Sequence, residues 1–121
     1  MIEITLPSPE GVADWLRTIG QRPVVIFKHS PTCGTSHQAL RAFEQYLAQA
    51  EKLAADYRIV DVLDERPLSQ ALAKATGVRH ESPQVLVLKN GACVWTASHI
   101  SINESSLNRH LPNFAASTPA A

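Results

Sequence analysis

The stretch PVVIFKHSPTCGTS, residues 23–36, changes from a strand pattern to a helix pattern around one cysteine. Residues 23–27 form a continuous apolar run, which is typical of a strand that is covered on both faces of a sheet. Turn-forming and hydroxyl residues follow, and a helical pattern begins at Cys33 or Gly34. The sequence therefore predicts that Cys33 lies beyond the end of a buried strand, where the next helix begins.

The rest of the chain alternates between strand and helix patterns in the order β-α-β-α-β-α-β-β-α. Long helices between the early strands require parallel strand neighbours, whereas Lys89-Asn90-Gly91 is a strong signal for an antiparallel hairpin. We therefore predict an α/β fold, with a mixed central sheet and helices on both faces. The strands are predicted over residues 1–6, 23–27, 57–63, 83–88 and 92–97, and the helices over about 8–20, 33–55, 66–77 and 101–111.

Three short motifs predict where helices begin and end. Ser8-Pro9-Glu10 resembles a helix start with a hydroxyl cap, and Ser101-Ile-Asn-Glu104 matches a capping box. Gly77 is placed to end the third helix, because glycine readily adopts the left-handed conformation found there.

Length and composition indicate one domain over residues 1–111, and the tail PNFAASTPAA, 112–121, is expected to be disordered. Eleven basic residues balance eleven acidic ones without a charge run, which argues against nucleic acid or an anionic membrane as the partner. The longest apolar stretches fall far short of the ~20 residues of a membrane span. The N-terminus lacks the basic and apolar regions of a secretion signal, so we expect a cytoplasmic protein.

The setting of Cys33 favours a reactive thiol. In open α/β sheets, sites form beyond the carboxyl ends of parallel strands, where the following helix begins. The free N–H groups and the positive dipole end of a first helical turn favour a thiolate over a thiol. The alternative is a buried thiol that packs as a small apolar group. The polar and turn-forming neighbours of Cys33 favour the reactive interpretation.

A second thiol suited to resolve a disulfide on Cys33 is missing from the motif. Ser36 occupies the position where a Cys-x-x-Cys protein carries its second cysteine, and its hydroxyl can also serve as an ordinary first-turn hydrogen-bonding group. Cys93 is expected near the hairpin turn, about 16 Å of strand away from the site, whereas a disulfide needs Cα atoms within about 7 Å. We therefore assign Cys93 to packing. A mixed disulfide on Cys33 would have to be resolved by a second small thiol.

Three neighbouring side chains could tune the thiol or contact a substrate. His37 follows Cys33 by one helical turn, so that its imidazole could favour the thiolate or take a proton, or could be an ordinary surface group. His29 could order the loop or touch the substrate, and Lys28 could reach a carboxylate on a small thiol. Cys33 and His37 alone are too few for a structural metal site, so no metal is expected. The loop 98–101 should border the groove, with Ser101 as a helix cap.

The motif residues resemble a known family. Cys33-Gly-Thr-Ser36 after a buried strand, with Ser82-Pro83 opening a later hairpin, resembles the thioredoxin fold over residues 1–111. The run FKHSPTCGTS, 27–36, is similar to the YtxJ-type monothiol bacilliredoxins of the bacillithiol system, whose usual run is close to F-K-H-S-x-x-C-P-I-S. The departure is Gly34-Thr35, where that family more often has Pro-Ile.

The resemblance implies a monothiol thiol–disulfide oxidoreductase that removes a small thiol, bacillithiol, from mixed disulfides on client proteins. Bacillithiol would be a co-substrate, and no tightly bound cofactor is implied. Cys33 would be the nucleophile, and the resemblance also implies a cis peptide bond between Ser82 and Pro83 facing it. The residues expected to frame the substrate are Thr32, Gly34, Thr35, Ser36, Ser82 and Pro83.

Two alternatives stay open. Gly34 also makes the motif similar to the Cys-Gly-x-Ser of monothiol glutaredoxins, some of which bridge an iron–sulfur cluster between subunits. Those proteins carry a lysine three residues before the cysteine, where this chain has Ser30. The other alternative is a non-catalytic thioredoxin-like interaction module whose cysteine is incidental.

Overall fold

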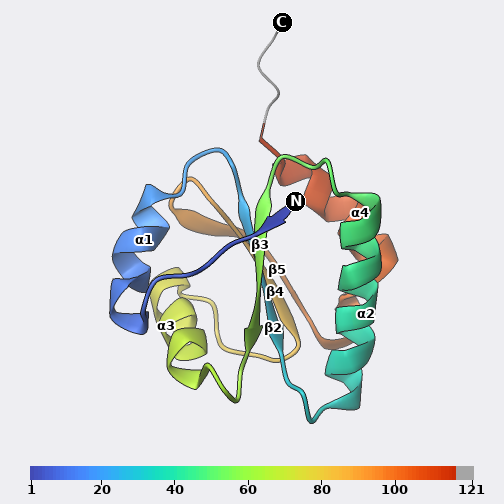
Figure 1. Cartoon of the computed structure of the whole chain (residues 1–121), viewed down its shortest axis with the longest axis horizontal. Helices are drawn as coiled ribbons and strands as arrows, with labels where there is room; N and C mark the ends of the chain where they lie inside the picture. Colours follow the sequence, from blue (N-terminus) through green and yellow to red (C-terminus); the bar gives the residue numbers. More distant parts are fainter. Residues whose placement is uncertain (117–121) are drawn as a thin grey trace, which may run out of the picture.

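A computed structural model describes residues 1–116. One five-stranded sheet in the order β1-β3-β2-β4-β5 forms the middle layer, with α1 and α3 on one face and α2 and α4 on the other (Figure 1). The predicted α/β fold with helices on both faces is confirmed. The strands are β1 (Ile2–Glu3), β2 (Val24–His29), β3 (Asp56–Asp61), β4 (Gln84–Lys89) and β5 (Ala92–Ser98); the helices are α1 (Val12–Thr18), α2 (Gly34–Gln49), α3 (Arg66–Thr76) and α4 (Glu104–His110), with short 3₁₀ helices η1 (Pro9–Gly11), η2 (His99–Ser101) and η3 (Leu111–Phe114).

The sheet is mixed, as the connections require. Strands β1, β3 and β2 are parallel, whereas β4 runs antiparallel to β2 and to β5. The turn between β4 and β5 places both Asn90 (φ 52°) and Gly91 (φ 78°) in the left-handed region. A two-residue turn of this kind matches the twist of the strands it joins. The predicted hairpin is therefore confirmed.

Strand β2 is buried on both faces, and its alternate residues enter two different core layers. Val24 and Ile26 pack with α1 and α3, whereas Val25 and Phe27 pack with α2 and α4. The Phe27 ring stacks on that of Phe43 in α2, with ring centroids 5.1 Å apart. The two layers hold β2 and the beginning of α2 in a fixed relation, and this positions the segment that contains Cys33.

Several elements are shorter than their patterns predict. Strand β1 contains only Ile2 and Glu3, because pairing with β3 ends there. Helix α2 ends at Gln49 and not near residue 55, because a turn that follows Ala50 leads the chain into β3. Gly77 ends α3 in the left-handed conformation (φ 73°), as predicted.

Two predicted helix caps are wrong. Ser8 makes no side-chain cap bond, and η1 comes before the α-helix, which begins at Val12. The capping box of α4 is formed by Asn103 and Ser106, since the Asn103 side chain accepts from the Ser106 N–H at 2.9 Å. Ile102 is buried in the core (4% exposed). The helix cap therefore follows it at Asn103, two residues beyond Ser101.

The ordered chain extends beyond the predicted boundary at residue 111. Residues Leu111–Phe114 form η3, and Phe114 packs against the core layer of α2 and α4. The N–H of Ala116 donates to the Ala54 carbonyl at 3.1 Å. The described structure therefore continues past residue 111, and positions 117–121 of the predicted tail lie outside the described residues.

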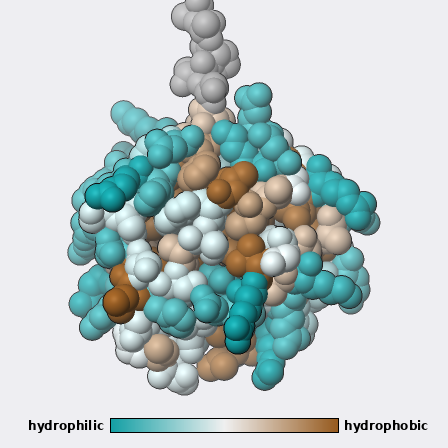
Figure 2. Space-filling model, turned by 180° about the vertical axis from the view of Figure 1, so that it is seen from behind, coloured by the Kyte–Doolittle hydropathy of each residue, from teal (hydrophilic) through white to brown (hydrophobic). Residues whose placement is uncertain are grey.

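Figure 2 shows the face opposite to that of Figure 1. Its surface is largely hydrophilic, and the apolar residues appear as separate small groups and not as one continuous patch. Scattered apolar residues of this kind are usual on protein surfaces. Within residues 1–116, no helix combines the length and the apolar character needed to cross a membrane.

Candidate active site

Cys33 caps the N-terminus of α2. Its backbone is extended (φ −111°, ψ 122°), and its free thiol is partly exposed. The Cys33 N–H donates to the Ser30 carbonyl at 3.1 Å, and the Cys33 carbonyl accepts the first helical bond, from the His37 N–H, at 3.1 Å. The amides of the first turn after a cap have no acceptor within the helix, and they form its positive end. The structure thus places the thiol where the sequence predicts it.

Ser36 is fully buried (0% exposed) in the first turn of α2. Its Oγ accepts from the Ser30 N–H at 2.9 Å and lies 2.8 Å from Nδ1 of His29. The hydroxyl therefore ties the end of β2 and the turn before Cys33 to the helix. The whole residue is enclosed, backbone included, so Ser36 presents no surface for the predicted substrate contact.

His29 is buried at the end of β2 and lies against His37, with ring centroids 4.8 Å apart in an edge-to-face arrangement. Burial lowers the pKa of His29, and a positive charge on His37 lowers it further. A neutral His29 ring can accept from the Ser36 hydroxyl, which leaves the Ser36 oxygen free to accept from Ser30. Of its two predicted roles, the structure shows His29 ordering the loop.

His37 is exposed on α2, and its Nε2 lies 2.7 Å from the Pro31 carbonyl. Because a carbonyl can only accept, Nε2 carries a proton and donates. The imidazole therefore bonds to the turn before Cys33 from the solvent-exposed side. Thr32 is exposed in the same turn.

The Ser82–Pro83 peptide bond is cis, as the family resemblance implied. Lys28 of β2 pairs with Gln84 of β4. Pro83, which precedes Gln84, therefore lies at the end of the sheet where the chain leaves β2 toward Cys33. The Pro83 carbonyl accepts from the His99 N–H at 3.0 Å, which joins this loop to η2. The Ser82 hydroxyl is buried and has no partner within residues 1–116.

A groove of about 220 Å³ begins beside Thr35 and runs between α2 and η2. The predicted loop does border it, through His99 and Ile100, whereas Ser98 and Ser101 do not line it. Ile100 is 83% exposed at its rim, and Gln38 on α2 also lines it. The sequence analysis did not single out Gln38, because a surface glutamine carries no local signal.

Lys28 does not face the groove, so its predicted contact with a small thiol is wrong. The side chain is fully buried (0% exposed), and Nζ donates to the Ser69 carbonyl at 3.0 Å and to Nδ1 of His80 at 3.3 Å. Alternate β2 residues point to opposite faces, and Lys28 follows Val24 and Ile26 toward α3. Burial lowers its pKa to about 8.

Cys93 lies next to the β4–β5 turn, opposite Leu88. It is partly buried against the core layer of α1 and α3, and burial raises the pKa of its thiol. Strand β4 separates it from the Pro83 end of the sheet. Within residues 1–116, no group of three or more histidine, cysteine or acidic residues is arranged to hold a metal ion.

The sheet order, the free thiol at the start of α2 and the cis proline at the same end of the sheet define a thioredoxin-fold protein with a single-cysteine site. Comparison with known protein families identifies the family within this fold to which the chain belongs. The family model described as monothiol bacilliredoxin BrxC matches residues 4–107, and the chain belongs to this family. The similarity that the FKHSPTCGTS run indicated is thereby confirmed.

Solved structures agree with this fold. One described as a candidate oxidoreductase with a thioredoxin fold is 35% identical, with a TM-score of 0.72 over 89% of this chain and 92% of the other. Thioredoxin from Fasciola hepatica is 18% identical, with a TM-score of 0.66 over 94% and 99% of the two chains. Thioredoxin from Malassezia sympodialis is 21% identical, with a TM-score of 0.64 over 94% and 90%. The family and the first of these structures support a redox function, and the two thioredoxins show the fold.

The buried bonds of Ser36 lead to a testable prediction. Ser36→Cys should allow an internal disulfide with Cys33 under mild oxidation, because it restores the Cys-x-x-Cys spacing. The reduced variant should also lose about 1–3 kcal/mol of stability, because a thiol replaces the hydroxyl that bonds to Ser30 and His29. Thiol counting after oxidation and urea unfolding of the reduced protein measure the two effects.

Ser36→Ala is the matched control, since it removes the same hydrogen bonds without adding a thiol. It should be destabilised to a similar extent and should form no disulfide. If reduced Ser36→Cys and Ser36→Ala are both as stable as the parent protein, the buried hydroxyl does not hold the loop.

Proposed function

We propose that this protein is a monothiol thiol–disulfide oxidoreductase that removes bacillithiol from mixed disulfides on client proteins through Cys33. One observation carries the proposal: the free thiol at the start of α2 has no resolving partner. Ser36 fills the resolving position with a buried hydroxyl, and Cys93 lies next to the turn at the far end of the hairpin. Membership of the monothiol bacilliredoxin family supports the same chemistry.

The reaction consists of two thiol–disulfide exchanges. In the first, the Cys33 thiolate attacks the bacillithiol sulfur of the mixed disulfide, and the client thiolate leaves and takes up a proton. In the second, the thiolate of another bacillithiol molecule attacks the bacillithiol sulfur now bonded to Cys33. This step releases oxidised bacillithiol and restores the Cys33 thiolate. The second bacillithiol molecule is the reductant: its sulfur is oxidised to the disulfide level while the client sulfur is reduced to a thiol, and the transferred bacillithiol sulfur stays at the disulfide level throughout.

The surroundings of Cys33 suit these exchanges. The positive end of α2 stabilises the thiolate both as attacking and as leaving group. We assign the substrate contacts to Thr32, Gly34 and Thr35, which are close to Cys33 in the chain, and to Ser82 and Pro83 at the same end of the sheet. The groove beside Thr35 offers polar groups from Gln38, His99 and Asn103 to the part of the small thiol that does not react.

Mass spectrometry tests which thiol the site accepts. The reduced protein is incubated with the disulfides of bacillithiol, glutathione and cysteine, and the mass added to the chain is located by peptide mapping. We expect one adduct, on Cys33, which forms fastest with bacillithiol disulfide, and Cys93→Ala should behave like the parent protein. Equal rates for all three disulfides would contradict bacillithiol specificity, and modification mainly at Cys93 would contradict the assigned nucleophile.

The proposed reaction also suggests where the protein works and what it meets there. A monothiol enzyme depends on a pool of reduced small thiol, which the cytoplasm provides. Its partners would be client proteins that carry a small thiol on cysteine, together with that thiol itself.

A further inference from the structure

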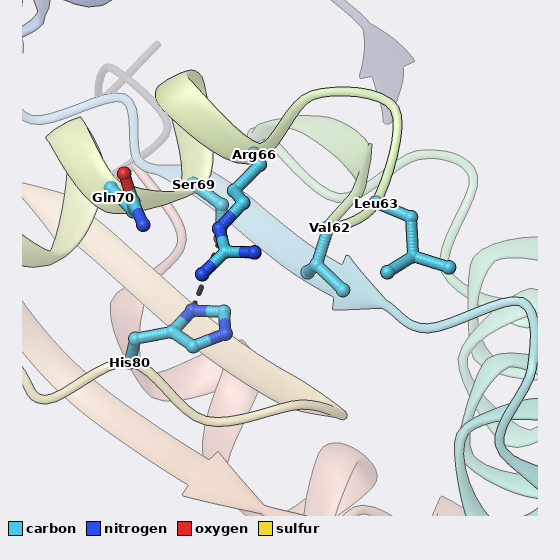
Figure 3. Close-up of a pocket in the computed structure, with 6 residues that line it drawn as sticks. All are labelled: Val62, Leu63, Arg66, Ser69, Gln70 and His80. Carbon is cyan, nitrogen blue, oxygen red and sulfur yellow. Dashed lines mark hydrogen bonds between the residues drawn. The ribbon is translucent and has the colours of Figure 1, made fainter.

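A second cavity lies on the α3 side of the loop that leads to Pro83. It measures about 180 Å³ and is separate from the groove beside Thr35. Figure 3 shows that α3 contributes one wall, the segment between β3 and α3 contributes a second, and His80 from the loop before β4 closes a third. Its lining residues are Val62, Leu63, Arg66, Ser69, Gln70 and His80.

The cavity borders a buried positive charge without a counter-ion. The Lys28 ammonium donates to the Ser69 carbonyl and to Nδ1 of His80, and both acceptors belong to residues that line the cavity. Neither acceptor is an anion, and none of the ion pairs within residues 1–116 includes Lys28. An unpaired buried charge is expensive, and buried cations in proteins are normally paired.

Arg66 adds a second positive charge. In Figure 3 its guanidinium extends across the cavity toward His80, and burial together with the charges of Lys28 and Arg66 lowers the pKa of that histidine.

Of the nearby carboxylates, Glu81 follows His80 in the chain, and its Oε1 lies 4.0 Å from Nε2 of His99. Its charge acts to raise the pKa of His80, against the larger lowering effects. Two others are engaged elsewhere. Asp61 accepts from the backbone N–H groups of Leu63 and Asp64, and Glu65 pairs with Arg58 at 2.7 Å. The lining itself contains no carboxylate.

The hydrogen bonds also orient the donors. Nδ1 of His80 lies 3.3 Å from the Lys28 ammonium and 3.1 Å from the Ser69 hydroxyl, the contact drawn as a dashed line in Figure 3. The ammonium can only donate and the hydroxyl can donate as well, so Nδ1 is the acceptor and the proton of the neutral ring lies on Nε2. His80 is exposed, so this N–H is accessible from solvent. Together with the Arg66 guanidinium and the Gln70 amide, it forms a set of donors around a cavity whose residues bring positive charge and no negative charge.

We propose that this cavity binds a small oxyanion, a carboxylate or a phosphate, between Arg66 and His80, with Lys28 as the buried charge that the anion offsets. Guanidinium groups bind both kinds of anion through two parallel hydrogen bonds. The volume suits a single anionic group and excludes a nucleotide. The site does not involve Cys33, so the proposal stands apart from thiol transfer and its test requires no redox chemistry.

The test follows the imidazole and Gln70 amide NMR signals of the full chain during titration with sodium phosphate, and separately with sodium malonate. Ionic strength is held constant with sodium chloride. We expect saturable shifts at His80 and Gln70 with phosphate, malonate or both, and the better ligand identifies the anion class. Arg66→Gln should weaken binding about ten-fold, the effect of losing roughly one hydrogen bond to a charged group.

Arg79→Gln is the matched control, because Arg79 is an exposed arginine in the same loop that does not line the cavity. Its affinity for the anion should equal that of the parent protein. His80→Ala, followed through the Gln70 amide, provides a second variant and should also bind more weakly. Shifts that never saturate, or that are the same in the Arg66 and Arg79 variants, would overturn the proposal.

Discussion

Cys33→Ser is expected to reduce the removal of bacillithiol from a client protein by at least about a thousand-fold, because a serine hydroxyl stays un-ionised at neutral pH and cannot take part in disulfide exchange. The substitution preserves the size of the side chain and the extended backbone of the helix cap. The rate is measured as release of bacillithiol from a client that carries it as a mixed disulfide, with free bacillithiol in excess.

Cys93→Ser is the control for this result. It removes the other thiol of the chain and should keep the parent rate, since Cys93 lies next to the hairpin turn, away from the Pro83 end of the sheet. Circular dichroism checks that both variants fold. Activity in Cys33→Ser above a tenth of the parent rate would show that a different group carries the reaction.

The protein is expected to become more stable as the pH rises from 7 to 9.5, because of Lys28. Burial lowers the pKa of this lysine to about 8 in the folded state, from its ordinary value of 10.5. Between these two values the unfolded chain binds more protons than the folded one, so the free energy of unfolding rises with pH. The gain from Lys28 is roughly 1–3 kcal/mol by pH 9.5.

The prediction is tested by urea unfolding at several pH values, with Lys28→Met as the comparison. Three other groups act in the opposite direction, since burial raises the pKa of Cys93, Tyr46 and Tyr57 and so favours their loss of protons in the unfolded chain. Because both proteins share these groups, subtracting the Lys28→Met curve from the parent curve isolates the lysine. If the difference in the free energy of unfolding between the two proteins stays constant with pH, the folded state does not lower the pKa of Lys28.

Much of the candidate site can be predicted from local sequence. The apolar run before Lys28 predicts a buried strand, and the hydroxyl and glycine residues that follow predict the helix start at which Cys33 is found. Ser36 stands where a second cysteine would be, and the sequence alone shows that the motif has no resolving thiol. These predictions succeed because they depend on bonds between residues that are close along the chain.

The buried position of Lys28 cannot be predicted from local sequence, because β2 is apolar on both faces. In a strand with one solvent-exposed face, apolar and polar residues alternate, and the alternation shows which side chains enter the core. The run before Lys28 is apolar throughout and carries no such pattern. Only the packing of α3 against the sheet decides that the ammonium lies beneath Ser69 and His80. The groove beside Thr35 likewise exists only where η2 meets α2.

The sequence by itself therefore determined the order of strands and helices, the position of Cys33 at a helix start and the absence of a resolving thiol in its motif. The tertiary structure alone decided which side chains the two helical layers enclose, and with them the roles of Lys28, His29 and Asn103. Local propensities specify the backbone, whereas burial and charge depend on segments that are distant in sequence and meet only in the folded chain.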